Sequence, residues 1–175
     1  GCDIMDSAVE SIDEAASMAQ DADVIIAVVG DCLCQNGEAK DRANLELSGR
    51  QNELVARLKE TGKPVVTVLV NGKPLCIGEV ARHSDAVIES FNSGDLGGLC
   101  VAELIAGRFN PSGKLPISFP RSSAQLPCYY NQYSGWHGGK YMDVEEGSLY
   151  DFGYGLSFTT YEYANLTLSQ EVASP

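Results

Sequence analysis

The chain has 175 residues, of which 44% are apolar and 21% charged, a composition typical of a globular protein large enough for one well-packed core. Acidic residues outnumber basic ones by 24 to 12, so the formal net charge is −12, and neither nucleic acid nor an anionic membrane surface is expected as a partner. The sequence also has no apolar run of roughly 20 residues, the length needed to span a bilayer.

The first 120 residues are expected to alternate between helices and strands. In chain order, the patterns predict a helix over 7–20, a strand over 24–29, a helix from 48 to a stop at 62, a strand over 65–70, a short helix over 75–82, a strand over 86–91, a helix over 97–106 and a strand over 115–119. Ser7 and Ser48 each have a capping partner three residues later, and the first two strands are apolar on both faces. The alternation predicts an α/β fold, a three-layer sandwich around a mainly parallel sheet.

The character of the sequence changes after Pro120. Residues 121–157 are rich in Tyr, Gly, Ser and Pro and are predicted to form an irregular arm packed on the sandwich. Residues 158–168 alternate between apolar and polar positions, which predicts a terminal β-strand. The positions expected to be buried in this strand are Phe158, Tyr161, Tyr163, Leu166 and Leu168. The chain is therefore divided into a sandwich over 1–120, an arm over 121–157 and a strand or linker over 158–175.

A long loop between the first strand and the following helix is the candidate functional segment. It runs for eighteen residues, from Gly30 to Leu47, and it follows the carboxyl end of a parallel strand, where open α/β sheets bind ligands. Its charged residues are Asp31, Glu38, Lys40, Asp41, Arg42 and Glu46. The polar residues that follow the next two strands are Asn71, Asn92, Ser93 and Asp95. These three loops are expected to converge on one edge, and their carboxylates, amides and guanidinium favour a sugar over a phosphate.

Each of these side chains also has a purely structural interpretation. Glu38 would be a solvated surface acid, and Asp41 with Arg42 a local ion pair worth under roughly 1 kcal/mol. Asp41, Arg42 and Asn92 are nevertheless the candidates for substrate binding. Trp136 is the fourth candidate, because an exposed indole on a glycine-rich loop stacks on sugar rings, although packing onto the domain would also explain it.

No cofactor and no metal site are expected. Six cysteines are too sparse for a disulfide scaffold in a chain of this length. Cys32-Leu33-Cys34 is a poor pair of metal ligands by itself. The cysteines are therefore interpreted as buried thiols or as free thiols without a function. Residues 94–98 lack the G-x-G-x-x-G spacing of a dinucleotide site, and there is neither a phosphate-binding P-loop nor a G-x-S-x-G nucleophile elbow. The alternative hypothesis of a flavodoxin-like nucleotide-binding domain is therefore supported only by the alternation of strands and helices.

Five segments of the chain carry recognisable motifs. They are residues 37–47 (GEAKDRANLEL), 62–66 (GKPVV), 70–75 (VNGKPL), 110–116 (NPSGKLP) and 152–157 (FGYGLS). In this order they resemble the second, α/β-sandwich domain of glycoside hydrolase family 3, roughly from Gly1 to Leu168. The resemblance implies part of a retaining β-glycosidase that acts on terminal β-D-glucosyl or related residues of β-linked oligosaccharides or aryl glycosides. It also implies a barrel domain before the sandwich and, in many members, a fibronectin-type module after it.

Retaining hydrolysis uses two carboxyl groups roughly 5–5.5 Å apart, one as nucleophile and one as general acid and then base. The resemblance implies that the nucleophile is an aspartate on the barrel, in a Ser-Asp-Trp type of segment that this chain lacks. Glu38 matches the position of the acid/base glutamate, and Glu46 is the second candidate. The chain without its barrel is therefore expected to be inactive.

The start of the sandwich departs from the family pattern. The strand–helix unit that normally opens this domain would precede Gly1, so the sheet is expected to have an exposed edge. Exposed edges pair with other chains, which predicts a homo-oligomer formed through this edge. A non-catalytic carbohydrate-binding or structural module is the alternative to the glycosidase.

Overall fold

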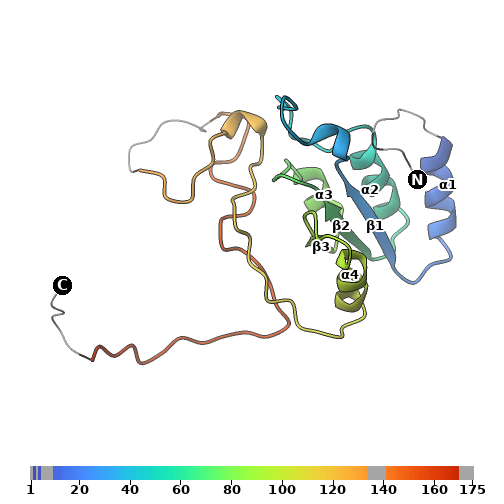
Figure 1. Cartoon of the computed structure of the whole chain (residues 1–175). Helices are drawn as coiled ribbons and strands as arrows, with labels where there is room; N and C mark the ends of the chain where they lie inside the picture. Colours follow the sequence, from blue (N-terminus) through green and yellow to red (C-terminus); the bar gives the residue numbers. More distant parts are fainter. Residues whose placement is uncertain (1, 3, 5–9, 134–140, 170–175) are drawn as a thin grey trace.

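The computed structural model describes residues 2, 4, 10–133 and 141–169 (Figure 1). Its elements in chain order are α1 (Glu10–Ala19), β1 (Ile25–Gly30), the short 3-10 helix η1 (Leu33–Gln35), α2 (Gln51–Lys59), β2 (Val65–Val70), α3 (Gly78–Arg82), β3 (Ala86–Glu89), α4 (Gly97–Ile105) and the 3-10 helix η2 (Ser123–Gln125). Apart from η1, the elements from α1 to α4 correspond to those predicted from the sequence, and α3 and β3 are shorter than expected. None of the helices in this part of the chain combines the length and the apolar character needed to cross a bilayer.

The three strands form one parallel sheet in the order β1-β2-β3 within the described residues. Gly30, the last residue of β1, pairs with Val70, and Leu69 pairs with Glu89, the last residue of β3. The carboxyl ends of the strands therefore lie side by side at one edge of the sheet. The predicted α/β fold with a parallel sheet is confirmed.

Helices α1, α2 and α3 pack together, with α2 lying on β1 and β2. The core beneath them includes Ile25, Ala27 and Val29 of β1 and Val55 of α2. Val28 points to the other face of β1 and is 64% exposed. The sequence predicts that both faces of this strand are covered, but the described residues cover one. The outer edge of β1 has no partner among the described strands, and pairing of two copies through it remains a prediction.

The start of α2 differs from the prediction, because the helix begins at Gln51 and Ser48 is not its cap. The buried Gln51 side chain instead accepts a hydrogen bond from Gly30 N and donates one to Gly30 O, both at 2.8 Å. The Ser48 hydroxyl accepts a hydrogen bond from Gln35 in the loop. The residues that were expected to cap the helix therefore connect it to the end of β1 and to the following loop.

The predicted strand over 115–119 does not join the sheet. Leu115 N donates to Tyr154 O and Phe119 N donates to Tyr150 O, each at 2.8 Å, so this segment pairs with the arm instead. Pro116 has no N–H group to donate, which interrupts any longer ladder. Phe119, which is 1% exposed, belongs to the core and anchors the arm to the sandwich.

The predicted terminal strand is wrong for the described residues, which extend to residue 169. Residues 160–168 have no regular secondary structure, and every side chain that was expected to be buried there is exposed, with Tyr163 at 93%. Figure 1 shows this segment running away from the sheet. Alternating apolar residues form a strand only where a neighbouring strand supplies hydrogen bonds, and the described part of the chain offers none to this segment.

Candidate functional site at the carboxyl edge of the sheet

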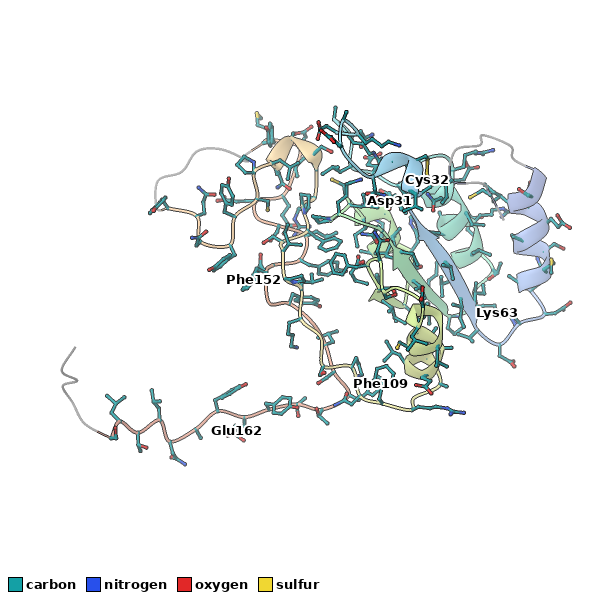
Figure 2. All side chains as sticks on the ribbon, viewed as in Figure 1. Asp31, Cys32, Lys63, Phe109, Phe152 and Glu162 are labelled. Atoms are coloured by element: carbon teal, nitrogen blue, oxygen red, sulfur yellow. A yellow bond between two sulfur atoms is a disulfide. The ribbon has the colours of Figure 1, made fainter. Side chains whose placement is uncertain are left out.

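Three loops meet at the carboxyl edge of the sheet, as the sequence predicts. Gly72, after β2, lies between the loop after β1 and the loop after β3: a Cβ atom built on Gly72 would be 2.7 Å from Asn36 Oδ1 and 3.1 Å from Asn92 Nδ2. Asp31 directly follows β1, and its Oδ1 accepts a hydrogen bond from Gly72 N at 3.2 Å. In Figure 2, Asp31 lies at this end of β1 and Lys63 at the opposite end of the sheet.

Lys73, from the loop after β2, contacts the loop after β1 at three points. Its Nζ donates to Gln35 O at 2.8 Å and to Asn36 Oδ1 at 2.6 Å, and it lies 3.4 Å from Asp31 Oδ2. The Asp31 side chain is 2% exposed and the Lys73 side chain 26%. Because this ion pair is largely shielded from water, it is less weakened by solvent and salt than a surface pair.

Further contacts hold the loop after β1 in shape. Asn36 Nδ2 donates to Cys32 O and Lys40 Nζ donates to Cys34 O, both at 2.9 Å. Cys32 and Cys34 are joined by a disulfide, which corrects the interpretation of these two residues as idle thiols. Because the two sulfurs are bonded to each other, neither is a free thiolate that could bind a metal ion. The described thiols include Cys76, Cys100 and Cys128.

Glu38 lies at the tip of a tight turn formed by residues 37–40. Lys40 N donates to Gly37 O at 3.3 Å and closes the turn. Gly37 has a φ of +124° and Ala39 a φ of +58°. A residue with a Cβ atom at positive φ costs roughly 1–2 kcal/mol, and such strained positions are found disproportionately at functional sites. Glu38 is exposed, so the turn presents its carboxylate to the solvent.

Arg42 does not pair with Asp41, which removes the local ion pair considered from the sequence. Its Nη2 donates to Glu46 O at 2.7 Å, while its Nη1 is buried without a hydrogen-bond partner in the described structure. Buried donors normally have an acceptor, so this nitrogen is an unsatisfied donor within the described residues. Asp41 is exposed on the same loop.

Asn92 is exposed and lies next to Gly72, where the three loops meet. Trp136 lies outside the described residues, so its predicted role is not placed. Three of the four substrate-binding candidates therefore belong to loops that meet at this edge.

Glu46, the second candidate for the acid, lies in a segment with a structural role. The flanking Leu45 and Leu47 are buried. Leu45 N donates to Ser123 Oγ at 2.8 Å, and Cys76 N donates to Leu45 O at 2.9 Å. This segment is fixed between the arm and the chain after β2, which makes Glu46 a suitable control for Glu38.

The sequence prediction missed Glu89, the last residue of β3. Burial raises the pKa of Glu89 to about 7; hydrogen bonds from Phe91 N and Asn71 oppose the shift, and the charge of Asp31 adds to it. Glu89 Oε2 and Asn71 Oδ1 are both buried without a hydrogen-bond partner among the described residues. In the sequence, a single glutamate within a short predicted strand has nothing to distinguish it from a surface acid. Only the sheet register places Glu89 beside the end of β2.

The described residues contain no group of three or more His, Cys, Asp or Glu side chains arranged to hold a metal ion. The chemistry available at this edge is therefore that of individual carboxylates and amides, together with Lys40, Lys73 and Arg42. Of the carboxylates described above, Asp31 is shielded by Lys73, Glu89 is partly buried, and Glu38 is presented outward.

The chain has close relatives among known glycosidases. It is 43% identical to a periplasmic beta-glucosidase of Salmonella typhimurium over 168 residues, which cover 90% of this chain and 22% of that protein. It is 42% identical to a beta-xylosidase of Formosa agariphila over 166 residues, which cover 93% of this chain and 23% of that protein. The chain thus spans less than a quarter of the length of these relatives.

Solved structures and a family model agree with these relatives. A beta-glucosidase from Listeria innocua in complex with glucose matches with a TM-score of 0.84 and 32% identity, over 92% of this chain and 24% of that one. Residues 3–158 match the model of the glycosyl hydrolase family 3 C-terminal domain. The chain therefore belongs to the C-terminal domain family of glycosyl hydrolase family 3.

Proposed function

We propose that this chain is part of a retaining β-glycosidase and that Glu38 supplies the general acid and base of its reaction. The substrate is a terminal β-D-glucosyl or related residue of an oligosaccharide or aryl glycoside. A barrel domain of the whole protein holds the nucleophile, so two domains share the site. The relatives named as beta-glucosidase and beta-xylosidase support this reaction class.

The observation that carries the proposal is the presentation of Glu38. The turn over 37–40 projects it from the loop after β1, with Ala39 held at a φ of +58° directly behind it. This loop lies at the carboxyl edge of a parallel sheet, where α/β folds bind ligands. A carboxylate that is exposed, and held by a strained backbone, is suited to meet a substrate brought by a second domain.

The proposed reaction has two steps. In the first, an aspartate of the barrel attacks the anomeric carbon, and protonated Glu38 gives its proton to the departing glycosidic oxygen. In the second, the Glu38 carboxylate takes a proton from the water that attacks the glycosyl–enzyme bond, which regenerates the acid. Each step inverts the configuration at the anomeric carbon, so the product has the same anomeric configuration as the substrate.

Four side chains are proposed to bind the sugar. Asp41 would accept hydrogen bonds from sugar hydroxyls, and Asn92 offers both a donor and an acceptor at the edge where the loops meet. The buried, unpartnered Nη1 supports Arg42 as a further donor. Trp136 is proposed to stack on a sugar ring.

We also propose that the chain does not hydrolyse glycosides by itself. A general acid must keep its proton until the transition state, whereas a carboxyl group in water is ionised near neutral pH. Glu38 is exposed in this chain, so the burial that a general acid requires would come from contact with the barrel. The nucleophile would also be absent.

The test compares Glu38→Gln with Glu46→Gln in the whole protein, using 2,4-dinitrophenyl and phenyl β-glycosides of glucose and xylose. Dinitrophenolate departs without a proton, whereas phenolate needs one. Glu38→Gln should lower kcat/KM for the phenyl glycoside by roughly 10²–10⁴-fold and for the dinitrophenyl glycoside much less. Glu46→Gln should keep both rates. Unchanged rates in Glu38→Gln would instead favour the non-catalytic module.

A further inference from the structure

Lys73 connects the loop after β2 to the loop that carries Glu38. Its three partners, Asp31, Gln35 and Asn36, all lie in the stretch of chain just before the turn over 37–40. These contacts join two segments that are separated by α2 and β2 along the chain. Lys73 is therefore one of the side chains that connect this loop to the chain after β2.

We propose that Lys73 is a positioning residue for Glu38: by holding residues 31–36 against the loop after β2, it fixes the 37–40 turn over the carboxyl edge of the sheet. This inference rests on the proposed function of Glu38. Lys73 acts through the loop, because its hydrogen bonds go to Gln35 and Asn36 and its ion pair to Asp31.

A continuous set of contacts runs from Lys73 to the turn. Asn36 accepts from Lys73 Nζ and donates to Cys32 O. The disulfide joins Cys32 to Cys34, and Cys34 O accepts a hydrogen bond from Lys40 Nζ. Lys40 N closes the turn that presents the glutamate. A shift at Asn36 is therefore transmitted to both ends of the turn.

The charge of Lys73 suits this role. Asp31 is almost fully buried beside it, and its other oxygen accepts a hydrogen bond from Gly72 N. A lysine ammonium has three donors, which matches its three oxygen partners here. Replacing Lys73 by methionine keeps most of the side-chain volume and removes all three interactions at once.

Loss of Lys73 is expected to slow mainly the reactions in which the leaving group must receive a proton from Glu38. A misplacement of about 1 Å in a catalytic group can cost up to roughly 100-fold in rate. Lys73→Met should therefore lower kcat/KM for the phenyl β-glycoside by about tenfold or more, and for the dinitrophenyl β-glycoside much less. Lys73→Arg, which keeps the charge and the donors, should restore most of the lost rate.

The experiment uses the whole protein and two further variants. Lys63→Met removes a lysine at the opposite end of the sheet and should leave both rates unchanged (Figure 2). Asn36→Ala removes one partner of Lys73 without leaving Asp31 unpaired, so it decides the question if Lys73→Met does not fold. The double variant Lys73→Met/Glu38→Gln should react with the phenyl glycoside no more slowly than Glu38→Gln alone, since the group being positioned is gone.

The outcomes separate the two proposals. If Glu38→Gln is sensitive to the leaving group but Lys73→Met and Asn36→Ala slow both substrates equally or not at all, the positioning role of Lys73 is wrong and the role of Glu38 stands. A further loss in the double variant also overturns the positioning role. If Glu38→Gln itself shows no leaving-group dependence, the proposed function fails first.

Discussion

A Cβ atom on Gly30 would lie 1.8 Å from the carbonyl oxygen of Val70, its partner in the sheet. The same carbonyl accepts a hydrogen bond from Asp31 N at 3.1 Å. The chain therefore leaves β1 and enters the candidate loop through a position with space only for glycine. The register of β1 and β2 thus determines where the loop that carries Glu38 begins.

Gly30→Ala should destabilise the protein by roughly 2–3 kcal/mol, because the atom that the new methyl group meets is backbone and cannot rotate away. Urea unfolding of the whole protein measures this loss. Gly78→Ala is the matched control, since a Cβ there has no heavy atom within 4 Å, and it should change stability by less than about 0.5 kcal/mol. If the two variants lost the same amount of stability, contact with the Val70 carbonyl would not be the cause of the loss in Gly30→Ala.

Gly72→Ala should disturb the site with little effect on the sheet. The new methyl group would lie 2.7 Å from Asn36 Oδ1, which Lys73 holds at 2.6 Å, so the amide must move and lose that bond. We expect about a tenfold fall in kcat/KM for a phenyl β-glycoside and less for the dinitrophenyl one. Thermal unfolding should change little. Full activity on both substrates would show that the amide relaxes without moving the loop.

Glu89 should make stability depend on pH. Below about pH 4.5 it is protonated in both the folded and the unfolded chain. Between about 4.5 and 7 the unfolded chain loses this proton while the folded chain keeps it, because burial raises the pKa of Glu89 to about 7. Its contribution to stability therefore falls as the pH rises through this window, by about 3 kcal/mol in all, and levels off above 7.

Glu89→Gln removes this titration and keeps the shape of the side chain. The variant should gain stability relative to the parent as the pH rises from about 4.5 to 7, as measured by urea unfolding at a series of pH values. Glu14→Gln, at an exposed position on α1, should show no such trend. A constant difference between Glu89→Gln and its parent across this range would contradict a raised pKa.

The sheet was predictable because its strands are continuous apolar runs. The run over 65–70 becomes β2 with the same bounds, and the run over 24–29 shifts by one residue in β1. The loops that meet at the carboxyl edge follow directly from this parallel order. Glu38 was located by its place on the long loop and by a motif, not by any property of a lone glutamate.

Other parts depend on contacts that a linear pattern does not contain. The segment over 115–119 has the apolar residues of a strand, but its hydrogen bonds go to the arm. The terminal segment alternates between apolar and polar residues but has no partner strand among the described residues. The spacing of Ser48 and Gln51 predicts a capping box, whereas the Gln51 side chain hydrogen-bonds to Gly30 at the end of β1. The position of Glu89 depends on the register of β2 and β3, and the contacts of Lys73 depend on the register of β1 and β2. The sequence specifies neither register.

The role of Glu38 is tested most directly by azide rescue of Glu38→Ala in the whole protein, with a dinitrophenyl β-glycoside as substrate. Without its base the variant forms the glycosyl–enzyme bond but hydrolyses it slowly, and azide needs no base to attack that bond. Turnover should rise with azide concentration and yield the β-glycosyl azide, whereas Glu46→Ala should not respond. No azide-dependent rate, or a product of inverted configuration, would contradict the assignment of Glu38 as the acid/base of a retaining reaction.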